Sequence, residues 1–113
     1  MMEIHQETCG EATVRLSMQG GLNIYEATAL KQALVDAVHQ HDRVELDLSA
    51  VDDLDTAGVQ LLMLAKQESL RQQHELHIVA HSEAVVSVFE FLNLAAFFGD
   101  PLVLLAESEQ GHG

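Results

Sequence analysis

Positively charged residues are scarce in the sequence: five Lys and Arg stand against eighteen Asp and Glu, for a net charge of -13 with histidine neutral. Such an acidic chain is repelled by the phosphates of nucleic acids and by anionic lipid headgroups. Proline occurs only once and 48% of the residues are hydrophobic, which excludes a disordered acidic tail and indicates a folded protein. We therefore expect neither nucleic acid nor a membrane surface as the partner.

Cysteine also occurs only once, so Cys9 cannot form an internal disulfide, and we interpret it as an inert thiol. The first residues lack the basic and apolar segments of a signal peptide. The longest apolar stretch, residues 85–98, is shorter than the roughly 20 residues that a membrane span needs. These absences predict a cytoplasmic location without direct membrane insertion.

The length of 113 residues corresponds to one domain, at about 150 residues per domain. No internal repeat or linker divides the chain. We expect a single domain over residues 1–106, followed by a flexible C-terminal tail over residues 107–113.

Apolar and polar residues alternate at residues 12–18, 43–48 and 76–80, and this period of two predicts strands with one buried and one solvated face. We also expect a weaker edge strand at residues 2–9 and a final strand at residues 102–106. A sheet of four to five strands is therefore expected.

Apolar residues recur at helical spacing at residues 25–41, 57–73 and 85–92, which predicts three helices between these strands. We expect the glycines of residues 19–21 to end the first central strand, and residues 49–55 to form an acidic turn.

The order of these elements predicts an α/β fold, a small mixed β-sheet with helices packed mainly on one face. A strand, helix and strand of this length form a crossover between parallel strands, which sets residues 43–48 beside residues 76–80. Doubly covered parallel strands are apolar throughout, whereas these strands alternate, so one face of the sheet is expected to remain open.

A candidate site lies beyond the carboxyl ends of the parallel strands, where open α/β sheets tend to bind ligands or partners. There, Asp55 or Thr56 is expected to cap the helix that follows, and Ala57 and Gly58 leave its first turn nearly bare. By itself, an Asp-Thr pair at this place is most simply a helix cap.

The segment LDLSAVDDLDTAGVQLL, residues 46–62, resembles the signature of the STAS, or anti-sigma factor antagonist, domain family. In that signature a strand ends in Asp-Leu-Ser, and Asp-Ser/Thr-x-Gly opens a helix. The resemblance extends to residues 21–25 and 76–80. It implies a STAS-like fold, a mixed sheet with helices on one face, as the periodicity also predicts.

The resemblance implies a bacterial signalling module whose partner is an anti-sigma factor, a GHKL-type Ser/Thr kinase or another signalling protein. In switching members of the family a kinase phosphorylates the hydroxyl of the motif, and the matching residue here is Thr56. The Asp-Thr-Ala-Gly motif also resembles members that are non-phosphorylated accessory subunits of lipid-transporting ABC ATPases. A weaker resemblance links the chain to members encoded with chemotaxis-like signalling components.

We expect a docking surface centred on Thr56, since a phosphate there would bring charge to an interface. The helix dipole favours an anion at that place by about 0.3–1 kcal/mol, whereas burying an unpaired charge in an interface costs several kcal/mol. Phosphorylation is therefore expected to dissociate a complex rather than unfold the domain. The other motif and partner-binding candidates are Asn23, Asp47, Ser49, Asp55, Ala57, Gly58, Gln60 and Ser82.

Asp47 and Asp55 have two interpretations: they help to place the nucleotide-metal centre of a kinase, or they are a solvated strand residue and a helix cap. Histidines do not predict a metal site, because a strand would hold His77 and His81 about 13 Å apart. With no glycine-rich phosphate loop or nucleophile elbow, we expect no cofactor and no enzymatic activity.

The chain has a dense apolar stretch near its end, and two interpretations apply to it. Core packing is the simpler one, but a helix packed on one sheet face cannot bury all of its sides. The surplus would then form a contact patch for a partner or for a homodimer. The residues concerned are Phe89, Phe91, Leu92, Leu94, Phe97 and Phe98.

Overall fold

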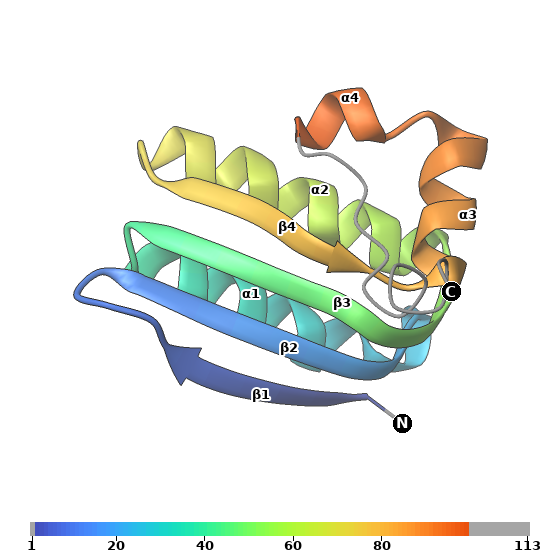
Figure 1. The fold of residues 1–113 in the computed structure, drawn as a ribbon, viewed down its shortest axis with the longest axis horizontal. Helices are drawn as coiled ribbons and strands as arrows, with labels where there is room; N and C mark the ends of the chain where they lie inside the picture. The colour runs from blue at the N-terminus through green and yellow to red at the C-terminus, as the bar shows by residue number, and fades with distance from the viewer. Residues whose placement is uncertain (1, 100–113) are drawn as a thin grey trace, which may run out of the picture.

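A computed structural model describes residues 2–99 of the chain. In it the strands β1 (Glu3–Thr8), β2 (Thr13–Leu22), β3 (Arg43–Leu54) and β4 (Glu75–His81) form one sheet in that order. β1 runs antiparallel to β2, while β2, β3 and β4 are parallel (Figure 1). The mixed sheet, the edge strand near the N-terminus and the placement of residues 43–48 beside 76–80 are confirmed.

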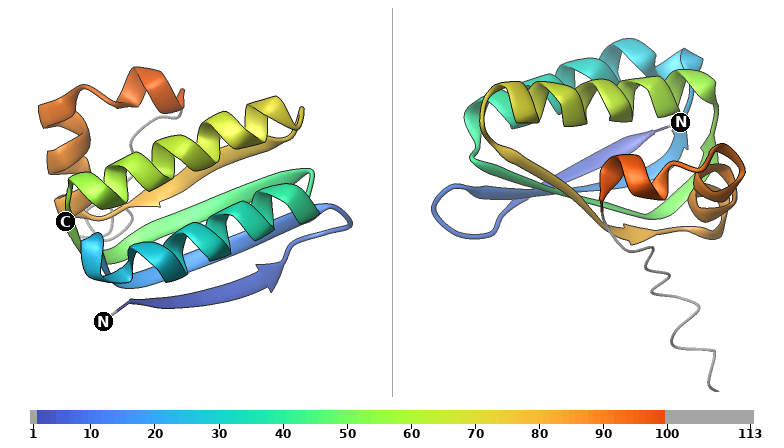
Figure 2. Two further views of the ribbon diagram at one scale, coloured as in Figure 1. Left: turned by 180° about the vertical axis from the view of Figure 1, so that it is seen from behind. Right: turned by 90° about the horizontal axis from the view of Figure 1, so that it is seen from above.

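The helices are a short 3-10 helix η1 (Ile24–Glu26), α1 (Ala27–Gln40), α2 (Thr56–Arg71), α3 (Glu83–Leu92) and α4 (Ala95–Phe98). α1 and α2 lie side by side on one face of the sheet, whereas α3 and α4 lie beside β4 at one end of it (Figure 2). The predicted final strand at residues 102–106 and the tail at 107–113 fall outside the described residues, so the domain boundary stays a prediction.

Two predicted interruptions of the sheet are wrong. β2 continues through residues 19–21 to Leu22, and β3 continues through the expected acidic turn to Leu54. The two strands pair along this extension, and register shifts after Ser17 and Gly20 absorb its irregularity. Such bulges let an irregular, glycine-containing segment keep backbone partners. The carboxyl edge of the sheet therefore lies at Leu22 and Leu54.

The core lies between the sheet and the two long helices. Alternate strand residues such as Leu16 and Leu46 are buried there against Leu34 of α1 and Leu62 of α2. The opposite face of the sheet is polar, and its side chains pair across the strands, as Arg15 and Glu45 do at 2.8 Å. The prediction of strands with one buried and one solvated face is confirmed.

Gly58 determines how closely the start of α2 approaches the end of β2. A Cβ atom at this position would lie 2.1 Å from the carbonyl oxygen of Leu22 and 2.9 Å from Cδ1 of Leu54. The same carbonyl accepts a hydrogen bond from the backbone N–H of Asp55 at 3.3 Å. Since the obstructing atoms include backbone, only glycine allows this contact without a shift of α2.

We predict that Gly58→Ala destabilises the fold by about 1–3 kcal/mol, as overpacking does, and that chemical denaturation will measure this loss. Helix propensity alone has the opposite sign and would stabilise the alanine variant by up to about 1 kcal/mol. Gln60→Ala, at an exposed position of the same helix, is the control and should change stability by less than about 0.5 kcal/mol. A Gly58→Ala variant as stable as the parent would contradict the close contact.

Candidate functional site

Asp55 is the N-cap residue of α2 and directly precedes its first residue, Thr56. Its backbone is extended, and its Oδ1 accepts a hydrogen bond from the N–H of Gly58 at 3.0 Å. Its Oδ2 accepts a second bond, from the N–H of Ile24 at 3.1 Å. Of the two caps considered from the sequence, Asp55 is therefore the one used. A single carboxylate also joins the first turn of α2 to the loop that follows β2.

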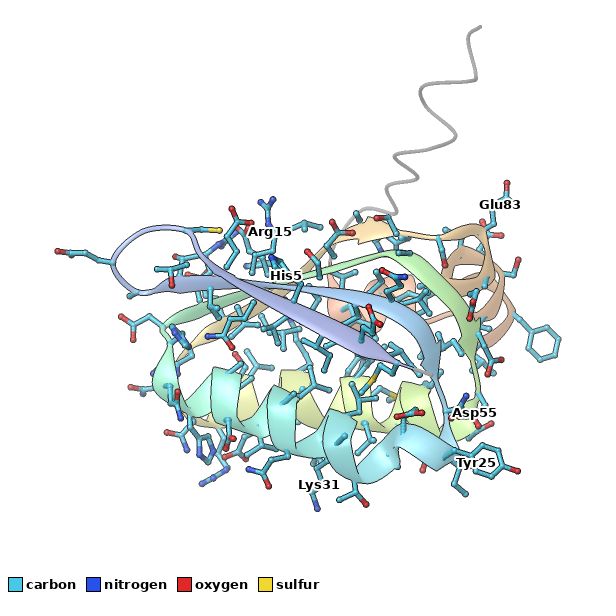
Figure 3. All side chains as sticks on the ribbon, turned by 90° about the horizontal axis from the view of Figure 1, so that it is seen from below. His5, Arg15, Tyr25, Lys31, Asp55 and Glu83 are labelled. Atoms are coloured by element: carbon cyan, nitrogen blue, oxygen red, sulfur yellow. The ribbon has the colours of Figure 1, made fainter. Side chains whose placement is uncertain are left out.

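Asn23 connects the loop after β2 to the end of β3. Its Nδ2 donates to Oδ2 of Asp53 at 3.0 Å, while its Oδ1 accepts from the N–H of Tyr25 at 3.0 Å. Tyr25 and Asp55 consequently lie side by side at one end of the molecule (Figure 3). The Tyr25 side chain is 91% exposed, so this loop adds an aromatic ring to the surface around the α2 terminus.

Thr56 is exposed at the first position of α2. Because Asp55 accepts the capping hydrogen bond, the Thr56 hydroxyl is not needed as the cap. The sequence left open which residue of this pair caps the helix. In the structure Asp55 is the cap, and Thr56 is an exposed residue beside it.

A groove of about 500 Å³ runs between the start of α2 and one side of α3, and Thr56 forms part of its wall. Its lining is mainly apolar, and it includes Phe91, whose side chain is 88% exposed. The lining residues are Leu54, Asp55, Thr56 and Val59 from β3 and α2, and Ser87, Val88, Phe91 and Leu92 from α3.

The other candidates in the first turn of α2 and at the start of α3 differ in accessibility. Ala57 is half-buried and Gly58 is buried, whereas Gln60 is exposed. Ser82 caps α3, its Oγ accepting from the N–H of Val85 at 3.1 Å. The backbone of the first turn is therefore less open than the sequence suggested, since Gly58 faces the sheet rather than solvent.

Asp47 and Ser49 do not join this group. Asp47 alternates with the buried Leu46 and Leu48, which places it on the helix-free face of β3. Its Oδ1 accepts hydrogen bonds from the N–H and the Oγ of Ser49, at 3.0 and 2.6 Å. Neither residue lines the groove beside Thr56.

The apolar stretch near the C-terminus is divided between the core and the groove. The rings of Phe89 and Phe98 stack with centroids 5.2 Å apart and are buried, together with Leu94. Phe91 and Leu92, by contrast, remain exposed beside the groove. Helical spacing is the sequence signal that distinguishes the exposed from the buried residues, because Phe91 lies outside the stripe of α3 that includes the buried Val85 and Phe89.

The positive side chains of the chain are engaged away from this site. Arg15 and Arg43 pair with carboxylates of the sheet, Arg71 pairs with Glu68 at 2.6 Å, and Lys66 donates to the Leu76 carbonyl. Arg71, and after it His39, lowers the pKa of Glu68 to about 2. Lys31 is exposed on α1, and none of the five cations lines the groove. An anion placed at Thr56 would thus lack a cation from this chain beside it.

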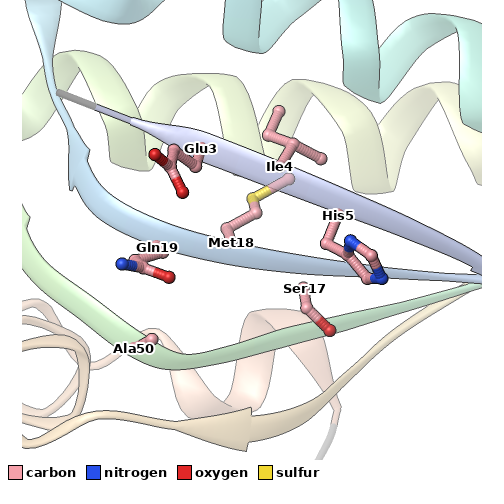
Figure 4. A pocket seen from close by; sticks show the side chains of 7 residues that line it. All are labelled: Glu3, Ile4, His5, Ser17, Met18, Gln19 and Ala50. Atoms are coloured by element: carbon pink, nitrogen blue, oxygen red, sulfur yellow. The ribbon is translucent and has the colours of Figure 1, made fainter.

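A smaller cavity of about 180 Å³ lies along β1 and β2 and reaches β3 at Ala50. None of the site residues predicted from the sequence lines it. Its lining residues are Glu3, Ile4, His5, Ser17, Met18, Gln19 and Ala50 (Figure 4). Within residues 2–99, no three His, Cys, Asp or Glu side chains gather in a way that would hold a metal ion. No helix in that range has the length and apolarity to cross a membrane.

A family model matches most of the sequence. The family described as "Mlab, STAS domain" matches residues 5–105, which is most of the chain. No curated protein matches the sequence significantly.

Solved structures share the fold over nearly the whole chain. An anti-sigma factor antagonist from Mycobacterium paratuberculosis has a TM-score of 0.78 at 24% identity, covering 98% of this chain and 93% of that one. Unphosphorylated SpoIIAA, an anti-sigma factor antagonist, has a TM-score of 0.73 at 17% identity, with coverages of 94% and 92%. The phosphorylated form of SpoIIAA, a Bacillus cell fate determinant, has a TM-score of 0.69 at 15% identity, with coverages of 98% and 100%.

We predict that Asp55→Ala costs about 1–2 kcal/mol of stability, because it removes the cap of α2. It should also accelerate hydrogen exchange at the amides of Gly58 and Ile24, which both donate to this carboxylate. The matched control is Ser82→Ala, which removes the cap of α3 and should leave the Ile24 amide as protected as in the parent. If exchange at Ile24 were unchanged in Asp55→Ala, the bridge between the two segments would be disproved.

Proposed function

The chain belongs to the STAS domain family, and on that premise we propose that it is a non-enzymatic signalling module of the bacterial cytoplasm, controlled by phosphorylation of Thr56. The module binds a regulatory protein through the surface around this residue. The observation that carries the proposal is the exposed residue Thr56 in the lining of the groove, with the capping role taken by Asp55.

The energies support a switch that acts on binding rather than on folding. A phosphate on Thr56 has a charge near -2 at a helix start, where the dipole stabilises it by about 0.3–1 kcal/mol. Repulsion from a carboxylate about 8 Å away costs roughly 2 kcal/mol per unit charge at an effective dielectric constant near 20, so about 4 kcal/mol for both charges, and much less where solvent screens it at this exposed position. The free domain tolerates both terms. An interface that buries the same charge without a cation loses several kcal/mol.

The similar structures support the class of partner. SpoIIAA is an anti-sigma factor antagonist with both an unphosphorylated and a phosphorylated form. For this chain we accordingly propose an anti-sigma factor, a GHKL-type Ser/Thr kinase or a related signalling protein as the partner. The kinase would transfer the γ-phosphoryl group of ATP to the Thr56 hydroxyl, releasing ADP and a proton.

A second candidate function is that of a non-phosphorylated accessory subunit of a lipid-transporting ABC ATPase. The observation that favours it is the apolar lining of the groove, because permanent interfaces are more apolar than transient ones. Stable copurification with a transporter ATPase, without any phosphate on Thr56, would support this candidate over the switch.

We predict that incubation with a cognate GHKL-type kinase and ATP adds one phosphoryl group to the intact protein. Intact-mass measurement should show this gain in the parent and in Thr28→Ala, whose exposed hydroxyl lies on α1. The gain should be absent in Thr56→Ala. A phosphoryl group on the Thr56→Ala protein would refute the assignment of this residue.

We further predict that Thr56→Ala and Thr56→Glu melt within a few degrees of the parent, because the side chain is exposed and the cap is Asp55. Capture of the partner should be weakened by about tenfold or more in Thr56→Glu alone, since the glutamate brings an unpaired charge into the interface. Binding is measured by titration calorimetry with the purified partner. Equal affinity of parent, Ala and Glu proteins would rule out control of binding by charge at Thr56.

A further inference from the structure

The groove between α2 and α3 exposes apolar side chains that a folded protein normally covers. Phe91 is 88% exposed and Leu92 is 45% exposed, although Phe89 on the same helix is fully packed in the core. Leu54, Val59 and Val88 continue this apolar surface along the groove. Exposed aromatic side chains beside a concave apolar surface are typical of sites that anchor a partner.

Carboxylates border the groove on both sides. Asp55 lines it from the α2 side. On α3, Glu83 and Glu90 lie four residues before and three residues after Ser87, which places them on the same side of the helix as this lining residue. Figure 3 shows Asp55 and Glu83 at the same end of the molecule. The apolar floor therefore has an acidic rim.

The charge of the chain decides between possible occupants of this groove. A second copy would bring the same excess of eighteen acidic over five basic residues, and four of those five cations are engaged within the fold. The residues after Gly99 include Asp100, Glu107 and Glu109 but neither Lys nor Arg, so they cannot match the rim either. Only a partner with its own positive charge complements it.

We propose that the groove docks an amphipathic helical segment of the partner, with apolar residues over Phe91 and with Lys or Arg residues facing the acidic rim. This proposal rests on the proposed function and names the chemistry of its partner. Amphipathic helices commonly bind in apolar grooves through residues spaced by three and four positions, and charged rims select their partners.

The position of Thr56 connects this docking to the switch. Thr56 lines the groove beside Asp55 and is exposed there, and none of the five Lys and Arg residues lines it. A phosphoryl group on Thr56 would occupy space that the docked segment needs and would lose hydration on burial without a cation from this chain. The segment is displaced as a result.

The test uses two synthetic peptides of about 18 residues, both with leucines along one helical face and alanines between them. One peptide has lysines on its polar face and the other has glutamates. Each is titrated into the isotope-labelled full chain, and amide shifts are followed by NMR. We expect the lysine peptide to bind with shifts concentrated in residues 54–59 and 87–92, more weakly at high salt, and at least about tenfold more tightly than the glutamate peptide.

Matched variants separate groove docking from general attraction to an acidic protein. Phe91→Ser should weaken binding of the lysine peptide by about tenfold, while Leu70→Ser, at an exposed apolar position near the other end of α2, should leave it unchanged. Glu83→Lys should weaken it several-fold, whereas Glu11→Lys, an exposed carboxylate between β1 and β2, should have no more than a small effect. Dispersed amide spectra will show that the variants are folded.

Three outcomes would overturn the proposal. The first is amide shifts spread over the whole acidic surface, and the second is an affinity for the lysine peptide that is unchanged in Phe91→Ser. The third is groove shifts that appear without peptide, depend on protein concentration and vanish in Phe91→Ser. This third result would indicate that a second copy of the chain occupies the groove. None of these depends on phosphorylation. If the peptide fails to bind while Thr56 still accepts phosphate, the partner chemistry is wrong and the proposed function survives, whereas the reverse result leaves the groove and removes the switch.

Discussion

The two hydrogen bonds of the Asp55 carboxylate hold together the part of the molecule on which its proposed activity depends. One oxygen caps α2 and the other holds the loop after β2, so helix and loop have fixed positions relative to each other. This is possible because Gly58 lets the helix approach the Leu22 carbonyl closely. The exposed Thr56 is thus presented from a rigid support, and modification there need not disturb the core.

The distribution of charge has a consequence for how the protein recognises others. Cations of the sheet face and of the α2 C-terminus are bonded to carboxylates or carbonyls within the fold. The end that carries Thr56 has carboxylates but none of these cations. In the proposed switch, a phosphate added there would therefore be an unpaired charge, and a proposed partner would have to supply the positive charge that the chain lacks at this end.

The helix α3 contributes both to the core and to the exposed apolar groove. Phe89 packs with Phe98 and with the ring of His81, while Phe91, two residues later, faces outward beside the groove. A helix of ten residues at the end of the sheet can bury only one of its sides, and its remaining apolar residues form a surface next to Thr56. Core packing and the proposed docking surface thus involve neighbouring residues on different sides of one helix.

The sequence by itself determined the central strands, the three longer helices and the open sheet face, because periodicity is a local property that residues a few positions apart decide. It could not show that β2 and β3 continue past residues 19–21 and 49–55, since those segments are held by pairing with each other across the sheet. Nor could it separate Asp47 and Ser49 from the groove, or place Phe91 beside Thr56. Only the tertiary structure decided these points, because they depend on contacts between residues about 30 positions or more apart in the chain.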